Sequence, residues 1–166
     1  MSPIVMATIH EKPTFVLVHG AWHTPQTYSL LQANLKSHDY PSIAVALPSA
    51  ITAVNQKAVE DFQPDVHAIR TAVISLLAEG KEVVAVMHSY AGIVGGQALE
   101  GLGVRQRKER GEKGGVVRLV FVMAYLVPEG FSVRGEAGDE TRGERWVVDE
   151  EACFILIHYW HKTAED

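Results

Sequence analysis

The chain has 166 residues, a length typical of one domain, and 47% of them are hydrophobic against 21% charged. This composition predicts a globular protein with a real core and excludes a disordered chain. The formal net charge of −5 at pH 7 disfavours nucleic acid and anionic membrane surfaces as partners, so we expect a small-molecule substrate.

The first predicted elements are a buried strand and a helix. Residues 15–18 form an apolar, β-branched run that stops abruptly at His19 and Gly20, as a buried strand does. A helix is expected between Pro25, a good first-turn residue, and Pro41, which forbids continuation. Its apolar residues recur at helical spacing: Tyr28, Leu31 and Leu35.

A second strand and a longer helix follow. Residues 43–47 are apolar and end at Pro48, which predicts a short strand. After a polar loop, a helix is expected from Pro64 to Gly80, with one apolar face. That face is formed by Val66, Ile69, Val73, Leu76 and Leu77.

The third and fourth strands are predicted over residues 83–87 and 116–122. Residues 91–99, rich in small side chains, predict the helix that follows the third strand. The charged stretch 105–113 holds several basic residues, but acidic residues interrupt them and no aromatic residue is interleaved. We therefore interpret this stretch as a solvated loop rather than a phosphate-binding or nucleic-acid-binding site.

Strands that alternate with helices predict an α/β fold with a mostly parallel sheet that is covered by helices on both faces. Past Ala124 the pattern loosens into scattered glycines and charges, and residues 153–161 fit a strand and a helix about equally well. We expect one domain over residues 1–166, with the sheet core at 14–124.

Two of the predicted strand ends carry residues suited to acyl chemistry. In an open parallel sheet, ligands bind beyond the carboxyl ends of the strands. After the first strand, Gly20 permits a tight bend, so the amides that follow it can point toward a developing negative charge. After the third strand, Ser89 stands on the turn into a helix, where its hydroxyl would be exposed.

These two segments, VLVHGAW and VVAVMHSYAG, resemble the α/β-hydrolase superfamily, and are most similar to its methylesterase and hydroxynitrile-lyase branch and to related fungal small-molecule hydrolases. The resemblance covers residues 14 to about 130. It implies a partial α/β-hydrolase fold without a cofactor, in which residues 125–166 start a cap region or form a divergent tail. It also implies the site residues: Ser89 as nucleophile, the backbone N–H groups of Ala21 and Tyr90 as oxyanion hole, and Gly20, Trp22 and His23 around the pocket.

The turn departs from the G-x-S-x-G pattern of the family, because Met87 and Ala91 replace its two glycines. Small residues are favoured there because strand and helix approach closely, so we expect the Met87 side chain to turn away from the helix. The alternative for Ser89 is a simple helix cap after a Rossmann-like strand. A dinucleotide site is disfavoured, since the nearby glycines lack G-x-G-x-x-G spacing.

A serine nucleophile needs a histidine base oriented by a carboxylate, in the chain order Ser, Asp or Glu, His. His158 is the candidate base, but with His161 it could instead ligate a metal or belong to a packed aromatic tail; we expect no metal. His88 is expected to pack rather than act as base, and His19 to have a structural role. We expect that the acid and base loops of the family are absent from this chain and that it is C-terminally truncated.

Two functional hypotheses follow. The first is a serine-type hydrolase of a small-molecule ester, thioester or lactone, used in specialised metabolism, with a cyanohydrin lyase as a variant. The second is a truncated, impaired homologue that survives as a binding protein or a non-functional product, and that self-associates through an exposed sheet edge. One cysteine, Cys153, and no leader-like or long apolar segment predict a cytoplasmic protein that does not enter a membrane.

Overall fold

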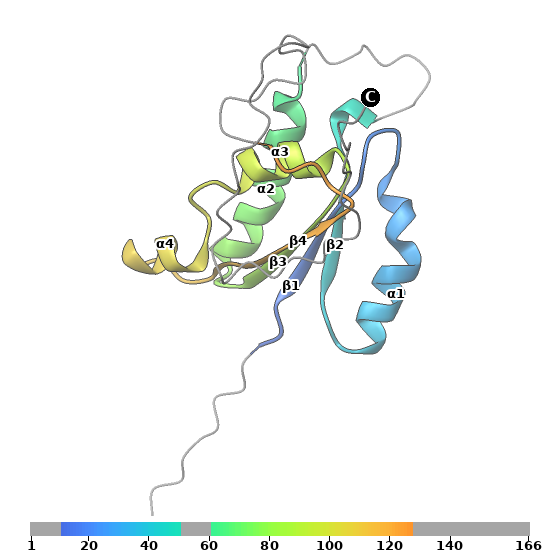
Figure 1. The fold of residues 1–166 in the computed structure, drawn as a ribbon. Coiled ribbons are helices and arrows are strands. Elements are labelled where there is room, and N and C mark those ends of the chain that lie inside the picture. The colour runs from blue at the N-terminus through green and yellow to red at the C-terminus, as the bar shows by residue number, and fades with distance from the viewer. Residues whose placement is uncertain (1–10, 51–60, 128–166) are drawn as a thin grey trace, which may run out of the picture.

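The computed structural model describes residues 11–50 and 61–127, which form a four-stranded sheet with helices on both faces (Figure 1). The strand order is β2-β1-β3-β4, and each neighbouring pair is parallel. The strands are β1 (Thr14–Val18), β2 (Ser42–Val45), β3 (Glu82–His88) and β4 (Gly115–Val122). The predicted α/β fold with a parallel sheet is therefore confirmed.

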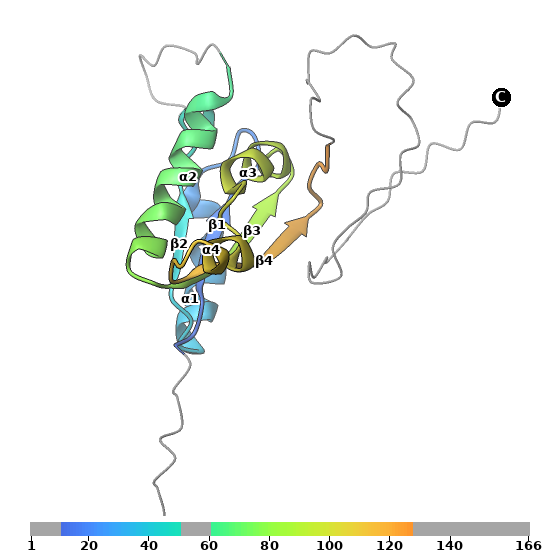
Figure 2. The same ribbon diagram turned by 90° about the vertical axis from the view of Figure 1, so that its left-hand side faces the viewer.

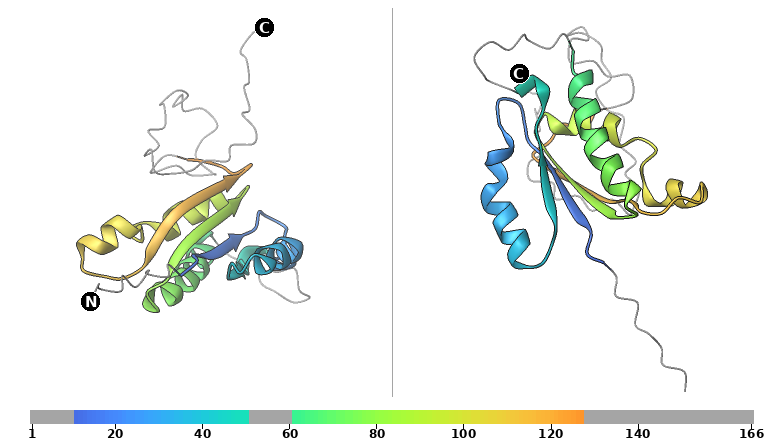
Figure 3. Two further views of the ribbon diagram at one scale, coloured as in Figure 1. Left: turned by 90° about the horizontal axis from the view of Figure 1, so that it is seen from below. Right: turned by 180° about the vertical axis from the view of Figure 1, so that it is seen from behind.

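The helices divide between the two faces of this sheet. The short 3-10 helix η1 (Pro25–Tyr28) continues into α1 (Ser29–Ser37), and the 3-10 helix η2 (Pro48–Ala50) follows β2; the others are α2 (Gln63–Ala78), α3 (Ala91–Leu99) and α4 (Val104–Glu109). α1 lies on one side of the sheet, and α2 and α3 lie on the other, as both halves of Figure 3 show. Each connection between parallel strands thus crosses over a face, as such connections must.

Alternate residues of each strand enter two separate cores, because successive side chains in a strand point to opposite faces. Val16 and Ala85 pack with Ile69 of α2 in one core, whereas Leu17 and Val86 belong to the core on the α1 side. Each fully buried aliphatic side chain of this kind contributes about 1.5–3 kcal/mol relative to leaving it exposed. Burial on both faces explains why these strands are continuously apolar in sequence.

Most of the predicted elements are confirmed, with small differences at their ends. The second strand ends at Val45 rather than at residue 47, since a 3-10 helix begins at Pro48. In the first helix, Tyr28 and Leu35 pack against the sheet as expected, but Leu31 remains 40% exposed. The face that the helix buries is therefore narrower than its apolar spacing suggested.

The prediction of a loop over residues 105–113 was wrong in part, because α4 (Val104–Glu109) occupies its first half. Arginine side chains hold this segment together. Arg107 donates to the carbonyl oxygens of Lys113 and Gly114 at 2.9 and 3.2 Å, and Arg110 donates to that of Gly101 at 2.9 Å. Arg107 also pairs with Glu112 at 2.7 Å. Arg107 and Arg110 thus help to hold this segment in its folded conformation.

The winding of the chain reverses between β1 and β3. From β1 the chain moves outward to β2, and it then returns past β1 to form β3 and β4 on the other side. Because neighbouring strands are parallel, their carboxyl ends meet at one edge of the sheet, toward which the arrowheads of β3 and β4 point in Figure 2. The crevice outside the ends of β1 and β3 is the switch point where ligands bind in such sheets.

Among the described residues, no helix is long and apolar enough to cross a lipid bilayer.

Candidate active site

Ser89 is held in a strained backbone conformation at the end of β3. Its φ is +53°, in the left-handed region that residues with a Cβ atom rarely adopt. Such a conformation costs on the order of 1–3 kcal/mol and persists where surrounding contacts enforce it. Here the Ser89 N–H donates to the carbonyl oxygen of Val122 at 3.3 Å, and the Ser89 carbonyl accepts from the N–H groups of Gly92 and Tyr125 at 3.0 and 3.1 Å.

The loop after β1 lies directly against this turn. A Cβ atom placed on Gly20 would stand 2.9 Å from Nδ1 of His88 and 3.0 Å from Cβ of Ser89, which is closer than real Cβ contacts allow. Gly20 is therefore required by close approach, not by an unusual φ. The two segments that the sequence singled out, separated by about seventy residues, are in contact at the switch point.

Two backbone amides in these segments have free N–H groups. Among the described residues, neither the Ala21 N–H nor the Tyr90 N–H donates a hydrogen bond. Tyr90 precedes α3, so its amide belongs to the helix N-terminus, where the helix dipole favours negative charge. This arrangement can receive an oxyanion that develops beside Ser89.

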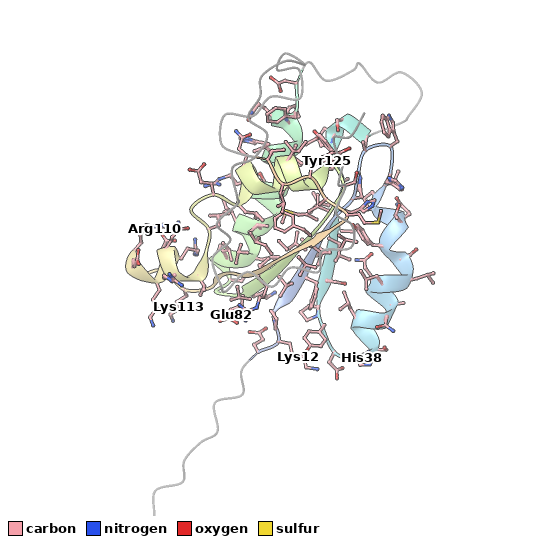
Figure 4. The ribbon with its side chains drawn as sticks, in the orientation of Figure 1. Lys12, His38, Glu82, Arg110, Lys113 and Tyr125 are labelled. Atoms are coloured by element: carbon pink, nitrogen blue, oxygen red, sulfur yellow. The ribbon has the colours of Figure 1, made fainter. Side chains whose placement is uncertain are left out.

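Large apolar side chains stand at the same end of the sheet. Trp22 is 90% exposed, and both Met123 and Tyr125 are 61% exposed. Figure 4 shows Tyr125 at this end of the sheet and Lys12, His38 and Glu82 at the opposite end. Exposed apolar side chains thus stand near the carboxyl ends of the strands, whereas Lys12, His38 and Glu82 stand at the opposite end (Figure 4).

Three histidines surround the loop after β1. His19 is buried, and its Nδ1–H donates to the Gly20 carbonyl at 2.9 Å, which gives it the structural role that we expected. The exposed His23 donates from Nδ1 to the Ala21 carbonyl at 2.9 Å, and its ring meets that of His88 edge to face, with centroids 5.6 Å apart.

His88 favours its neutral form. Burial lowers the pKa of His88 below the ordinary value of 6.5, and electrostatic repulsion from the neighbouring His23 and His19 lowers it further. At pH 7 the His88 ring is thus neutral, and it packs beside Gly20 and His23.

The prediction that Met87 turns away from the helix was wrong. Met87 is fully buried, and its Sδ atom lies 2.2 Å from where a Cβ on Gly95 would be. Its side chain therefore packs against α3, in a slot that Gly95 leaves open. The glycine that lets strand and helix approach each other stands on the helix in this chain, instead of on the strand.

Gly92 provides a second close approach at the start of α3. A Cβ there would lie 2.2 Å from the carbonyl oxygen of Tyr125 and 3.0 Å from Cβ of Ala124. The segment after β4 can therefore lie across the first turn of the helix. The other proposed participants in catalysis, His158 and the metal alternative with His161, lie outside the described residues.

Residues 15–161 match the sequence model of the alpha/beta hydrolase family. The chain belongs to the α/β-hydrolase family. Two curated fungal relatives agree with this. The α/β-hydrolase nvfD of Aspergillus novofumigatus is 36% identical over 146 residues, which are 88% of this chain and 56% of the relative. A probable hydrolase of a Phoma species is 33% identical over 133 residues, which are 80% of this chain and 50% of the relative.

Solved structures share the fold of this α/β-hydrolase. Tomato methylketone synthase I complexed with 2-tridecanone superimposes with a TM-score of 0.53 at 22% identity, over 68% of this chain and 40% of that one. Polyneuridine aldehyde esterase gives a TM-score of 0.52 at 23% identity, over 69% and 41%. The chain thus spans about half the length of the curated relatives that it matches, and less of the structures.

Proposed function

We propose that this α/β-hydrolase cleaves a small-molecule ester, thioester or lactone through an acyl intermediate on Ser89. The observation that carries the proposal is the left-handed φ of +53° at Ser89, at a turn that touches the loop after Gly20. A serine that only capped the helix would adopt an extended conformation and accept a hydrogen bond from the first helical turn. The φ of Ser89 is positive, and among the described contacts no N–H of the first turn of α3 donates to its side-chain oxygen; only its backbone carbonyl accepts such a bond, from Gly92.

In the proposed reaction, the Ser89 hydroxyl oxygen attacks the substrate carbonyl carbon while its proton passes to a base. The carbonyl oxygen becomes an oxyanion and accepts hydrogen bonds from the N–H groups of Ala21 and Tyr90. Collapse of this intermediate expels the alcohol or thiol, which takes the proton from the base. Water then attacks the acyl-serine by the same route and releases the acid.

The base that we propose is His158, since it follows Ser89 in the chain order of the family. General base catalysis of this kind contributes about 10²–10⁴-fold to the rate. The variant His158→Ala should therefore lose at least about a hundredfold in the rate of Ser89 acylation. His38→Ala is the matched control, because His38 lies at the opposite end of the sheet (Figure 4). Equal rates in both variants would remove His158 from the mechanism and leave Ser89 in place.

The apolar side chains around the strand ends support a substrate with an apolar acyl or alcohol group. Trp22 and Tyr125 are both largely exposed at this end, where they can contact such a group. Pockets for small ligands in general combine apolar walls with a few polar groups that orient the reacting atoms. The amides beside Ser89 would supply that orientation.

A fluorophosphonate probe and p-nitrophenyl acetate test the nucleophile directly. We expect the probe to label one peptide, which contains Ser89, and the ester to be hydrolysed; Ser89→Ala should abolish both. Ser37→Ala is a suitable control, because the exposed Ser37 hydroxyl donates to the Asn34 carbonyl within the last turn of α1. If the protein neither reacts with the probe nor hydrolyses the ester, the proposal fails and a non-catalytic binding role takes its place.

A further inference from the structure

A buried carboxylate lies next to the proposed acyl-transfer site, and the mechanism above does not use it. Asp65 is completely buried in the first turn of α2. It accepts hydrogen bonds from the Ser49 N–H at 2.9 Å, from the Ser49 hydroxyl, and from the Tyr90 hydroxyl at 2.8 Å. We call these three residues, Ser49, Asp65 and Tyr90, the Asp65 anchor.

The anchor joins three elements that are distant in the sequence. Ser49 lies in η2 after β2, Asp65 begins α2, and Tyr90 immediately precedes α3. Tyr90 is the residue after Ser89, so its side chain connects the strained turn to α2, where Asp65 lies. Since a tyrosine side chain has few rotatable bonds, fixing the hydroxyl also restricts the backbone that carries it.

Packing of the helices alone does not require this polar cluster. α2 and α3 already share an apolar core that includes Ile69, Val73 and Val94. A buried carboxylate is expensive to desolvate, and apolar residues of similar volume often stabilise a protein as well or better. Retained buried polar groups therefore point to a demand for one particular geometry.

We propose that Asp65 is a positioning residue for acyl transfer, which holds the Tyr90 amide toward the oxyanion site through the Tyr90 hydroxyl; this inference rests on the proposed function of Ser89. The Tyr90 amide can stabilise an oxyanion only if it is directed there before the reaction begins. A displacement of about 1 Å at such a donor can reduce the rate on the order of a hundredfold.

The protonation state of Tyr90 supports the same arrangement. Burial raises the pKa of the Tyr90 phenol, and the hydrogen bond to Asp65 raises it further. The hydroxyl therefore remains protonated and donates to Asp65 across the pH range in which an esterase works.

The test is Tyr90→Phe, which removes the hydroxyl and keeps the ring. The fluorophosphonate labelling rate is measured against probe concentration, which separates the maximal rate of labelling from probe affinity. We expect the maximal rate to fall about tenfold or more while affinity changes less than about twofold, because the backbone amide acts in the transition state. If Tyr90→Phe only lowered stability, the molecules that remain folded would still be labelled at the wild-type maximal rate.

Arg70→Met is the matched control. Arg70 also links α2 to α3, but it donates to the carbonyl oxygens of Ala98 and Glu100, at 2.8 and 3.0 Å, at the end of α3 distant from Ser89. This variant should lower stability without changing the maximal rate. Asp65→Asn, which can still hydrogen-bond both hydroxyls, should retain more of the rate than Asp65→Ala.

Amide hydrogen exchange separates failure of the anchor from failure of the nucleophile. The N–H groups of Gly92 and Ile93 donate to the carbonyls of Ser89 and Tyr90, both at 3.0 Å, so their exchange reports on the turn. Exchange there should accelerate in Tyr90→Phe and not in Arg70→Met. If the wild-type protein is labelled and Tyr90→Phe is labelled at the same maximal rate, the anchor is overturned and Ser89 stands. If the wild-type protein is not labelled, the proposed function fails. In that case hydrogen exchange still tests the anchor: if exchange at Gly92 and Ile93 is the same in Tyr90→Phe as in the wild-type protein, the anchor is overturned as well.

Discussion

Replacement of Gly20 by alanine should separate the two loops of the site. The added methyl group would meet Nδ1 of His88 at 2.9 Å and Cβ of Ser89 at 3.0 Å, so one segment must retreat by roughly 0.5 Å or more to reach ordinary van der Waals separation. Overpacking of this kind destabilises a protein by about 1–3 kcal/mol. Because the retreat carries the Ala21 amide away from Ser89, we expect acylation to slow about tenfold or more.

Two measurements and a control decide the outcome. Urea denaturation gives the free energy of unfolding, and fluorophosphonate labelling of the folded protein gives the acylation rate. Gly96→Ala is the control, since a Cβ on Gly96 in α3 has no neighbour within 4 Å. It should stabilise the helix by about 0.5–1 kcal/mol and leave labelling unchanged. If Gly20→Ala is as stable and as reactive as the wild-type protein, the close contact between the two loops does not exist in solution.

Three further predictions concern the same turn. Ser89→Gly should raise the free energy of unfolding by about 1 kcal/mol, because glycine adopts a positive φ without strain. The same variant should abolish labelling, since it lacks the hydroxyl. A loss of stability would contradict the strained geometry. Gly95→Ala should cost about 1–3 kcal/mol by its clash with Met87 Sδ, and a double-mutant cycle with Met87→Ala should show coupling; strict additivity would refute the contact. In an NMR titration His88 should have a pKa below 6.5, which His23→Ala raises in part. Since the unfolded chain then binds more protons than the folded one, this histidine's contribution to stability is present above pH 6.5 and falls as the pH drops through the lower folded-state pKa.

The sheet could be predicted from sequence because its strands are buried on both faces. Continuous apolar runs such as residues 83–87 carry a strong signal, and the alternation with helices fixes parallel pairing. The two loops of the proposed site could be predicted because the carboxyl ends of parallel strands meet at one edge of the sheet. Strand order did not follow from the sequence, yet it places the loop after β1 beside the turn after β3.

The orientation of Met87 could not be predicted, because it depends on a residue one helix further along the chain. A methionine at the first position of the turn suggested crowding, and only the position of Gly95 opposite its sulfur shows how the side chain is accommodated. The Asp65 anchor was missed for a related reason. An acidic residue after Pro64 is ordinary in the first turn of a helix, where it interacts with the dipole. Its burial, and its contact with Tyr90, appear only once α2 lies across α3.

Backbone strain in the described residues is concentrated at the proposed site. Of the four residues other than glycine with positive φ, Asp39 follows α1, where the N–H groups of Asp39 and Tyr40 close the helix in a Schellman motif, an ordinary use of that conformation. The other three are Trp22, Ser89 and Met123, which follow the carboxyl ends of β1, β3 and β4. A tryptophan, a serine and a methionine are poor choices for left-handed positions if only folding matters, since glycine or asparagine would avoid the strain. Strain of this kind collects at functional sites, where surrounding contacts hold a side chain in a fixed direction, and its position here agrees with the proposed role of Ser89 as nucleophile.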